Sequence, residues 1–145
     1  MSTEEEFDIV VIGGGPGGYA SALYGAAAGL SVAIVERDKV GGTCLHRGCI
    51  PAKEFLETAA VHRTIVGAKE FGINVSDFST DFAVSQDRKN AVVDKLFKGL
   101  SGLLKGRKVT TLTGARSIRT VTSCCGARRR IVSAKPTSVV IAKTR

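Results

Sequence analysis

Two cysteines separated by four residues are the side chains of this sequence best suited to chemistry. Cys44 and Cys49 lie in the segment GGTCLHRGCIPAK, residues 41–53. A thiol pair that cycles through a disulfide needs two sulfurs close enough to bridge, open to exchange, and polarised so that one is a thiolate. Four intervening residues at a junction between a loop and a helix meet the distance requirement, and a helix N-terminus at Cys49 favours a thiolate. His46 and Arg47 could add positive charge nearby.

Two other interpretations of these cysteines stay open. Unreactive cysteines are common because the residue packs well in cores, although the flanking glycines argue against such a core. A metal bound by Cys44, His46 and Cys49 would need a fourth ligand, since zinc sites usually have four. The remaining cysteines, Cys124 and Cys125, are adjacent and so lack the C-x2-C spacing of a structural zinc site. The sequence therefore predicts redox chemistry and no metal.

A glycine fingerprint for a nucleotide precedes the cysteines. Gly13, Gly15 and Gly18 form G-x-G-x-x-G between an apolar run, residues 7–12, and an alanine-rich stretch typical of a helix. Gly13 is expected to allow a tight turn, Gly15 the approach of a pyrophosphate to the backbone, and Gly18 close packing of helix on strand. The helix N-terminus offers amides and partial positive charge to the phosphates.

An acidic residue strengthens this fingerprint. Glu36 follows Gly18 by 18 residues and ends a second apolar run, residues 31–35. A carboxylate at this position can accept hydrogen bonds from both hydroxyls of an adenosine ribose and disfavours a 2′-phosphate. A glycine-rich surface turn with an unrelated glutamate is the alternative. Strand, glycines, helix, strand and acid stand in the order of a dinucleotide site, which favours the nucleotide.

The order of elements indicates an α/β fold that begins with a βαβ unit. Strands are predicted at residues 7–12 and 31–35, and helices at about residues 19–28, 50–68 and 81–104. Short strands are predicted from Val109 onward, in the segments VTTLT, RTVTS, RRIVS and SVVIA. We therefore expect a Rossmann-like domain with a central parallel sheet, helices on its faces, and a small, incomplete β-meander near the C-terminus.

The segment around the cysteines also resembles a known family. GGTCLHRGCIPAK is similar to the redox-active segment of the class I pyridine nucleotide-disulfide oxidoreductases, the group of dihydrolipoamide dehydrogenase, glutathione reductase and mercuric reductase. The resemblance covers residues 7 to about 112, and C-L-x-x-G-C-I-P is most similar to the lipoamide branch. It implies that FAD is the dinucleotide at Gly13, Gly15, Gly18 and Glu36.

The resemblance implies a role for further residues. Cys44 matches the interchange thiol that meets the dithiol substrate, and Cys49 matches the thiol that contacts the flavin. Lys53 matches a lysine that lies against the flavin, where a cation would stabilise the reduced, anionic ring. A plain surface lysine is the other interpretation of Lys53. Gly42 and Thr43 match positions that line the FAD phosphates.

The activity implied is that of an FAD-dependent disulfide oxidoreductase, most like dihydrolipoyl dehydrogenase, which converts dihydrolipoamide and NAD+ to lipoamide and NADH. The implied partners are the dihydrolipoyl groups of a 2-oxoacid dehydrogenase complex and a second copy in a homodimer. Two alternatives stay open. One is a stand-alone FAD-binding or redox-relay domain, and the other is a fragment of an enzyme like glutathione, mycothione or mercuric reductase.

The chain departs from the family pattern in length. Family members are several times longer, and they contain a nicotinamide domain, a second FAD segment and an interface domain with a catalytic His-x4-Glu pair. Neither His46 nor His62 can serve as that histidine, because each precedes the place of the interface domain. We therefore expect no turnover by this chain alone.

The last third of the sequence departs as well. Where the family has G-x-G lining the adenine, this chain has Gly114 followed by alanine and arginine, and Gly114 is the remaining candidate for contact with FAD. We therefore expect an FAD-binding domain with the redox pair, residues 1–112, and a divergent basic tail, residues 113–145. A truncated or frame-disturbed gene is one explanation for this tail.

The net charge of +8 comes entirely from this tail. Residues 1–112 contain 13 basic and 13 acidic residues, whereas residues 113–145 contain eight basic residues, no acidic residue and no aromatic residue. Specific nucleic-acid binding is disfavoured, because a basic folded motif with aromatic residues for stacking is missing. No apolar run approaches the ~20 residues of a membrane span, and the acidic start MSTEEE is unlike a secretory signal. We expect a cytoplasmic protein.

Overall fold

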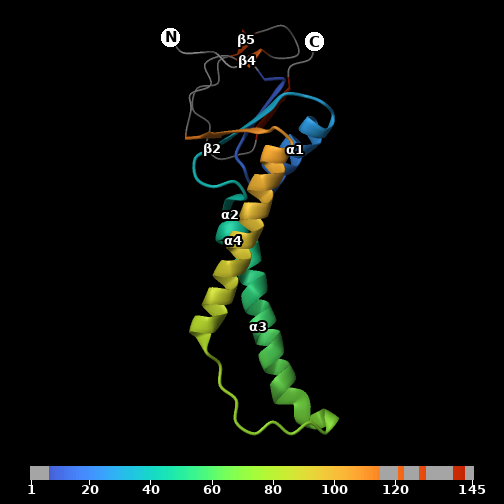
Figure 1. The fold of residues 1–145 in the computed structure, drawn as a ribbon, viewed down its shortest axis with the longest axis vertical. Helices are drawn as coiled ribbons and strands as arrows, with labels where there is room; N and C mark the ends of the chain where they lie inside the picture. The colour runs from blue at the N-terminus through green and yellow to red at the C-terminus, as the bar shows by residue number, and fades with distance from the viewer. Residues whose placement is uncertain (1–6, 115–120, 123–127, 130–138, 143–145) are drawn as a thin grey trace. The chain divides into compact units, whose positions relative to one another are not determined.

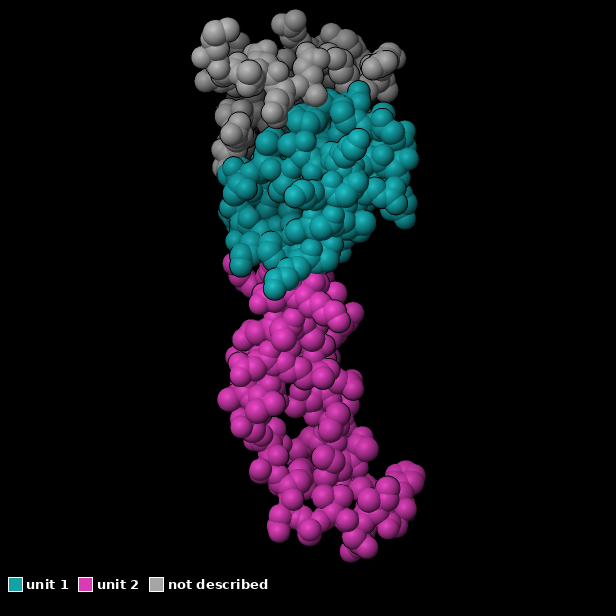
Figure 2. Space-filling model, in the orientation of Figure 1, with its two compact units in different colours: residues 1–42, 97–145 teal, residues 43–96 magenta. Residues whose placement is uncertain are grey.

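The structure, a computed structural model, forms two compact units (Figure 1). It describes residues 7–114 and the backbone of residues 121–122, 128–129 and 139–142. Figure 2 colours unit 1, residues 1–42 and 97–145, in teal and unit 2, residues 43–96, in magenta. The boundary predicted after residue 112 marks where the sequence departs from the family pattern, and it stays a prediction.

A four-stranded sheet forms the centre of unit 1, in the order β3-β2-β1-β6. The strands are β1 (Ile9–Ile12), β2 (Val32–Glu36), β3 (Thr110–Thr113) and β6 (Val139–Ala142). β2 pairs in parallel with both β1 and β3, with Ile9 opposite Val32 and Ala33 opposite Thr110. β6 runs antiparallel to β1. The predicted α/β fold is confirmed, with a central sheet that is parallel across β1, β2 and β3.

The core of unit 1 lies where these strands meet α1 (Pro16–Ala27). Val11 and Ile34 are fully buried, and burying each such side chain contributes about 1.5–3 kcal/mol. The buried residues of α1 are small, namely Gly18, Ala22 and Gly25. Small side chains let the helix approach the strands closely, as the third glycine of the fingerprint predicts.

Two helices, joined by a loop, build unit 2. They are α3 (Cys49–Gly67), which continues into the 3₁₀ helix η1 (Ala68–Phe71), and the part of α4 (Phe82–Gly106) that ends at Leu96. Arg88 Nε lies 3.0 Å from Glu54 Oε2, and the stacked rings of Phe55 and Phe82 are 5.5 Å apart. These contacts hold α3 and α4 side by side, as Figure 1 shows. No residue of α3 is classed as buried.

The long helices agree with the sequence-based predictions. Those predicted at 50–68 and 81–104 form α3 and α4 within two residues of the expected ends. The helix predicted from about residue 19 begins earlier, at Pro16, which suits the first turn because proline has no amide to leave unpaired. None of the helices in the described part of the chain combines the length and apolarity needed to cross a bilayer.

The prediction missed two short segments and is only partly tested at the C-terminus. The loop expected before Cys49 contains a five-residue helix, α2 (Gly42–His46), and η1 was not expected. The structure describes one antiparallel pair of the predicted β-meander, β4 (Val121–Thr122) with β5 (Arg128–Arg129). Cys124 and Cys125 lie outside the described residues.

Exchanging Gly18 for alanine tests how closely α1 approaches β1. A Cβ at residue 18 would collide with the carbonyl oxygen of Gly13, so the helix or the turn would have to move. We expect Gly18→Ala to lower the free energy of unfolding by about 1–3 kcal/mol, the usual cost of overpacking, as measured by urea denaturation.

Gly17→Ala is the matched control for this substitution. Nothing lies within 4 Å of the Cβ position at Gly17, and alanine exceeds glycine in helix propensity by up to about 1 kcal/mol. We expect this variant to be as stable as the parent or more stable. Equal losses in the two variants would contradict the close contact at Gly18.

Candidate functional site

The turn between β1 and α1 holds the glycine fingerprint. Gly13 has a φ of 96°, a left-handed conformation that glycine adopts without strain, and its amide donates to the Val35 carbonyl at 2.8 Å. Gly15 precedes the first turn of α1, which no side chain caps. Nothing lies within 4 Å of the Cβ position at Gly15. The start of α1 is therefore open to an anionic group.

Glu36 holds this turn with its side chain. Its Oε2 accepts a hydrogen bond from the Gly14 amide at 2.7 Å, and its Oε1 accepts one from the Asp38 amide at 3.0 Å. The sequence predicts contact of Glu36 with a ribose but not this structural role, because only the fold identifies the amide partners. A carboxylate has about four acceptor sites, so two hydrogen bonds do not exhaust it.

One further segment reaches the same turn, and another reaches the end of β2. The Gly41 amide donates to the Gly14 carbonyl at 2.7 Å, and Gly42, with a φ of 58°, lies so close that its Cβ would be 2.9 Å from the Gly15 Cα. The Gly114 amide donates to the Glu36 carbonyl at 3.0 Å. Glycine at residue 42 thus lets its segment meet the fingerprint closely, whereas the Cβ position of Gly114 faces open space and glycine there suits its φ of 111°.

The structure distributes the predicted site residues over both units. Unit 1 brings together the candidates at the glycine turn: Gly13, Gly15, Gly18, Glu36, Gly42 and Gly114. Unit 2 contains the other four candidates: Thr43, Cys44, Cys49 and Lys53.

The thiol pair lies at the junction of two helices in unit 2. Cys44 belongs to α2, and Cys49 is the first residue of α3, so its predicted place at a helix N-terminus is confirmed. Both are free thiols in this structure, with Cys44 partly buried and Cys49 exposed. Gly48 lets the helices meet, since a Cβ there would lie 3.2 Å from the Thr43 carbonyl oxygen. Gly48 was not among the predicted site residues, and its signal in the sequence is a glycine directly before the helix.

The hydrogen bond with the Cys49 thiol raises the pKa of Cys44 above that of an ordinary cysteine. Such a bond favours the protonated form of Cys44. Partial burial and the charge of Cys49 raise this pKa as well, whereas the Cys49 amide and the Lys53 ammonium act in the opposite direction. The reduced pair therefore keeps a proton on Cys44 to higher pH than an isolated thiol would.

Lys53 acts on the thiol pair from α3. It follows Cys49 by four residues, which places both side chains on one face of the helix. Its positive charge lowers the pKa of Cys44. The resemblance implies only a flavin contact for Lys53, and the i, i+4 spacing from Cys49 is the sequence signal for this second effect.

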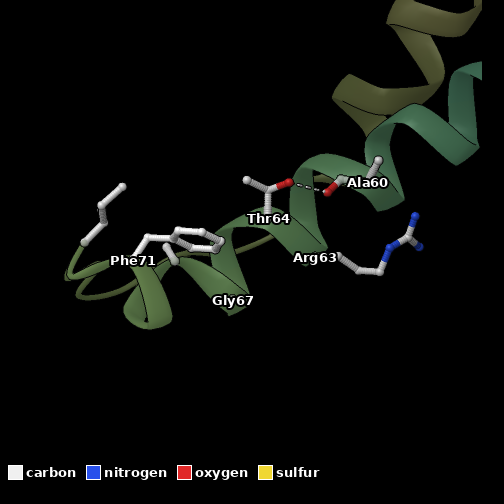
Figure 3. A pocket seen from close by; sticks show the side chains of 7 residues that line it. Ala60, Arg63, Thr64, Gly67 and Phe71 are labelled. Atoms are coloured by element: carbon white, nitrogen blue, oxygen red, sulfur yellow. Dashed lines mark hydrogen bonds between the residues drawn. The ribbon is translucent and has the colours of Figure 1, made fainter.

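A separate cavity of about 720 Å³ lies at the end of α3 and along η1, within unit 2 (Figure 3). Apolar side chains such as Phe71 and Ile73 form much of its lining. The Arg63 side chain points away from the Phe71 ring, and the Thr64 hydroxyl donates to the Ala60 carbonyl at 3.0 Å. None of the predicted site residues lines this cavity.

A metal held by the thiol segment was the lesser alternative to the predicted redox pair. Within residues 7–114 and the other described positions, no three His, Cys, Asp or Glu side chains form a group that could hold a metal ion. The structure therefore does not place Cys44, His46 and Cys49 as a ligand set.

Comparison with known proteins finds one family whose model covers both the glycine turn and the thiol pair. The family model for pyridine nucleotide-disulphide oxidoreductases matches residues 7–142. This chain belongs to that family. The predicted resemblance to this family is thereby confirmed.

Individual relatives agree with this membership. A dihydrolipoyl dehydrogenase of Bacillus subtilis (strain 168) is 49% identical over 109 residues, which are 75% of this chain and 23% of that protein. Another, from Chlorobaculum parvum, is 40% identical over 139 residues, which cover 92% of this chain and 29% of that protein. The chain thus spans about a quarter of the length of these relatives.

A solved structure has the same fold. It is the Cu(II) complex of the HOCl-induced flavoprotein disulfide reductase RclA from Escherichia coli, which is 29% identical to this chain with a TM-score of 0.61. The match covers 79% of this chain and 23% of RclA. The predicted fold class is confirmed by this similarity as well as by the sheet itself.

Replacing Cys49 by alanine tests the coupling of the two thiols. Because Cys49 raises the pKa of Cys44, its removal lowers that pKa and increases the thiolate fraction of Cys44 at about pH 8. We expect Cys44 to be alkylated faster by iodoacetamide in Cys49→Ala than in the reduced parent, with the midpoint of the rate profile at lower pH. Peptide mass spectrometry follows Cys44 separately from the other cysteines.

Lys53→Gln is the control, because it should shift the pKa of Cys44 in the opposite direction. Loss of a cation that lowers the pKa of Cys44 should move the midpoint to higher pH and slow alkylation. A midpoint that stays the same in Cys49→Ala would show that the two thiols do not interact in solution.

Proposed function

We propose that this chain forms the FAD-binding and disulfide-bearing part of an FAD-dependent disulfide oxidoreductase most like dihydrolipoyl dehydrogenase. The observation that carries the proposal is the hydrogen-bonded pair of thiols, Cys44 and Cys49, where α3 begins. Relatives named dihydrolipoyl dehydrogenase, 40% and 49% identical to this chain, support the lipoamide branch.

The backbone at the glycine turn fits the pyrophosphate and ribose of FAD. Open space at Gly15 and the uncapped start of α1 suit a pyrophosphate. Glu36 lies at the same turn and retains acceptor sites for ribose hydroxyls. Glycine at residue 42 leaves no side chain on the segment that meets the turn, and the space around the Cβ position of Gly114 is open. When bound, FAD supplies the acceptor for the two electrons that the thiol pair receives.

The thiol pair takes up these electrons by disulfide exchange. In the oxidised protein Cys44 and Cys49 share an S–S bond, and a thiolate of the dithiol substrate attacks the Cys44 sulfur. That bond breaks, a mixed disulfide forms at Cys44, and Cys49 leaves as a thiolate. The second substrate thiol gives its proton to Cys44 as its sulfur displaces Cys44 from the mixed disulfide. The raised pKa of Cys44 holds this proton there.

Lys53 and Thr43 complete the proposed site. The Lys53 ammonium lies one helical turn after Cys49 and favours negative charge around the pair. We assign it, in addition, to the reduced and anionic flavin ring. Thr43, whose carbonyl accepts the Arg47 amide at 2.9 Å, is assigned to the FAD phosphates together with Gly42.

The proposed reaction in the longer relatives passes electrons from dihydrolipoyl groups of a 2-oxoacid dehydrogenase complex to NAD+, in a homodimer. Assays of a full-length relative with dihydrolipoamide, glutathione disulfide and mercuric ion distinguish the lipoamide branch from the other reductases. The cytoplasmic location stays a prediction from the sequence.

Substitution of Glu36 tests the FAD site. Loss of a charge-assisted contact with the ribose should weaken FAD binding by about 1.5–3 kcal/mol, measured by fluorescence titration. Glu36→Ala also leaves the Gly14 amide without its acceptor, so the melting temperature without FAD should fall. Glu36→Gln keeps one carbonyl acceptor and should lose FAD affinity with a smaller loss of stability.

Glu57→Ala is the control, because it removes one acidic side chain from unit 2 and leaves the turn unchanged. It should bind FAD as the parent does. Equal FAD affinity in all the Glu36 variants and the parent would remove Glu36 from the site.

Oxidation of the purified chain should link Cys44 to Cys49. The two thiols already share a hydrogen bond, and a disulfide needs the Cα atoms within about 4.4–6.8 Å. Peptide mapping without reductant identifies the link, and Cys49→Ser should leave Cys44 unlinked or joined to a small thiol. A dominant bond between Cys44 and Cys124 would overturn the assignment of the redox pair.

A further inference from the structure

A second cavity, of about 520 Å³, lies in unit 1 between the last turns of α4, the loop after β2 and the start of β3. Its floor is apolar, because Val40, Leu104 and Val109 are buried. Its rim is basic and polar: Lys39, Lys105 and Lys108, with Ser101, Thr110 and Thr111. We call this cavity the lysine pocket. None of the residues proposed to hold FAD lines it.

Lys108 has a backbone conformation that lysine rarely adopts. Its φ of 57° makes it the only non-glycine residue with positive φ among those that the structure describes. The residue ends α4: its amide donates to the Lys105 carbonyl, and the Val109 amide donates to the Leu104 carbonyl, both at 3.0 Å. This pattern is a Schellman motif, in which the left-handed position usually belongs to glycine.

The chain itself uses glycine in the same motif elsewhere. Gly29 after α1 and Gly72 after η1 have φ values of 83° and 74°, with the same two hydrogen bonds back to the preceding turn. At the end of α4 a lysine stands in that position at a cost in backbone strain. Strained residues concentrate at functional sites, and this one adds an ammonium to the pocket.

Lys39 reaches the pocket from a different element. Its Nζ lies 5.7 Å from the centre of the Phe97 ring on α4, a cation–π contact that orients the side chain. Favourable interaction with the α4 dipole accounts for lysines at a helix C-terminus, but it does not account for Lys39 on a separate loop or for the strain at Lys108.

The charge of the pocket favours an anion. Asp38 is the one acidic residue in its lining, against three lysines. The structure shows no ion pair for Lys105 or Lys108 with any described residue. Hydroxyls add neutral donors, and a volume of this size suits a small molecule rather than a macromolecule. Lysine is a common phosphate ligand in proteins.

We propose that the lysine pocket binds a small, multiply charged phosphate compound. Lys39, Lys105 and Lys108 neutralise its charge, and the hydroxyls of Ser101 and Thr110 fix its orientation. The pocket is separate from the glycine turn, so its occupancy does not depend on the proposed FAD site.

Amide NMR spectra of the full chain, titrated with inorganic tripolyphosphate, test the proposal. We expect saturable shifts at residues 38–40 and 104–111. Shifts confined to residues 13–19 would place the anion at the start of α1, and shifts confined to residues 115–145 would place it on the basic tail. Either outcome would overturn the proposal. A parallel titration with ADP distinguishes a nucleotide from an inorganic chain, and saturable shifts around the pocket with either one support it.

Variants separate binding from stability. Lys108→Gly removes the ammonium and relieves the strained conformation, so tripolyphosphate should bind about three- to tenfold more weakly while the melting temperature rises. Lys39→Gln should weaken binding by a similar factor. Lys98→Gln is the control, because it removes the same charge from an exposed position on α4 outside the pocket. Undiminished binding in Lys108→Gly and Lys39→Gln, or an equal loss in Lys98→Gln, would refute the site.

Discussion

The turn after β1 is the constraint on which unit 1 depends. Gly18 packs directly on the Gly13 carbonyl, which fixes the start of α1 against the strand. Glu36 then ties the Gly14 amide to the end of β2, and the Gly41 amide bonds to the Gly14 carbonyl. Three chain segments therefore meet at one turn: the turn with the start of α1, the end of β2, and the segment at Gly41. The close packing that holds the sheet and helix together also leaves the start of α1 uncapped and open.

At the thiol pair, in contrast, side chains near a helix end determine the pKa of Cys44. Gly48 lets α3 begin close to α2, and this brings the Cys44 and Cys49 thiols into hydrogen-bond contact. The contact raises the pKa of Cys44, whereas Lys53 lowers it. On balance the pKa of Cys44 is raised, so Cys44 keeps its proton. The start of α3, in contrast, favours negative charge. Disulfide exchange needs this asymmetry, since one sulfur must accept the proton and the other must leave as a thiolate.

The sequence predicts the regular elements well because their signals are local. Apolar runs mark β1 and β2, and helical periodicity marks α3 and α4. The five-residue helix α2 is too short for periodicity to show, and its first residue is a glycine with positive φ. The antiparallel direction of β6 has no signal in an apolar run such as SVVIA. The bonds of Glu36 to backbone amides likewise depend on which segments the fold brings together.

The glycine turn and the thiol pair, which the proposal combines in one site, differ in how much buried apolar surface stabilises them. The glycine turn adjoins a core in which Val11 and Ile34 are fully buried. α3 has no buried residue, and Leu56 and Val66 on it are 64% and 62% exposed. Elements with few buried apolar contacts open locally at low free energy. Since Cys49 begins α3 and Lys53 lies on its second turn, any contact that covers the apolar side chains of α3 also stabilises the thiol pair. The electrostatics of Cys44 are thus linked to the packing of this helix.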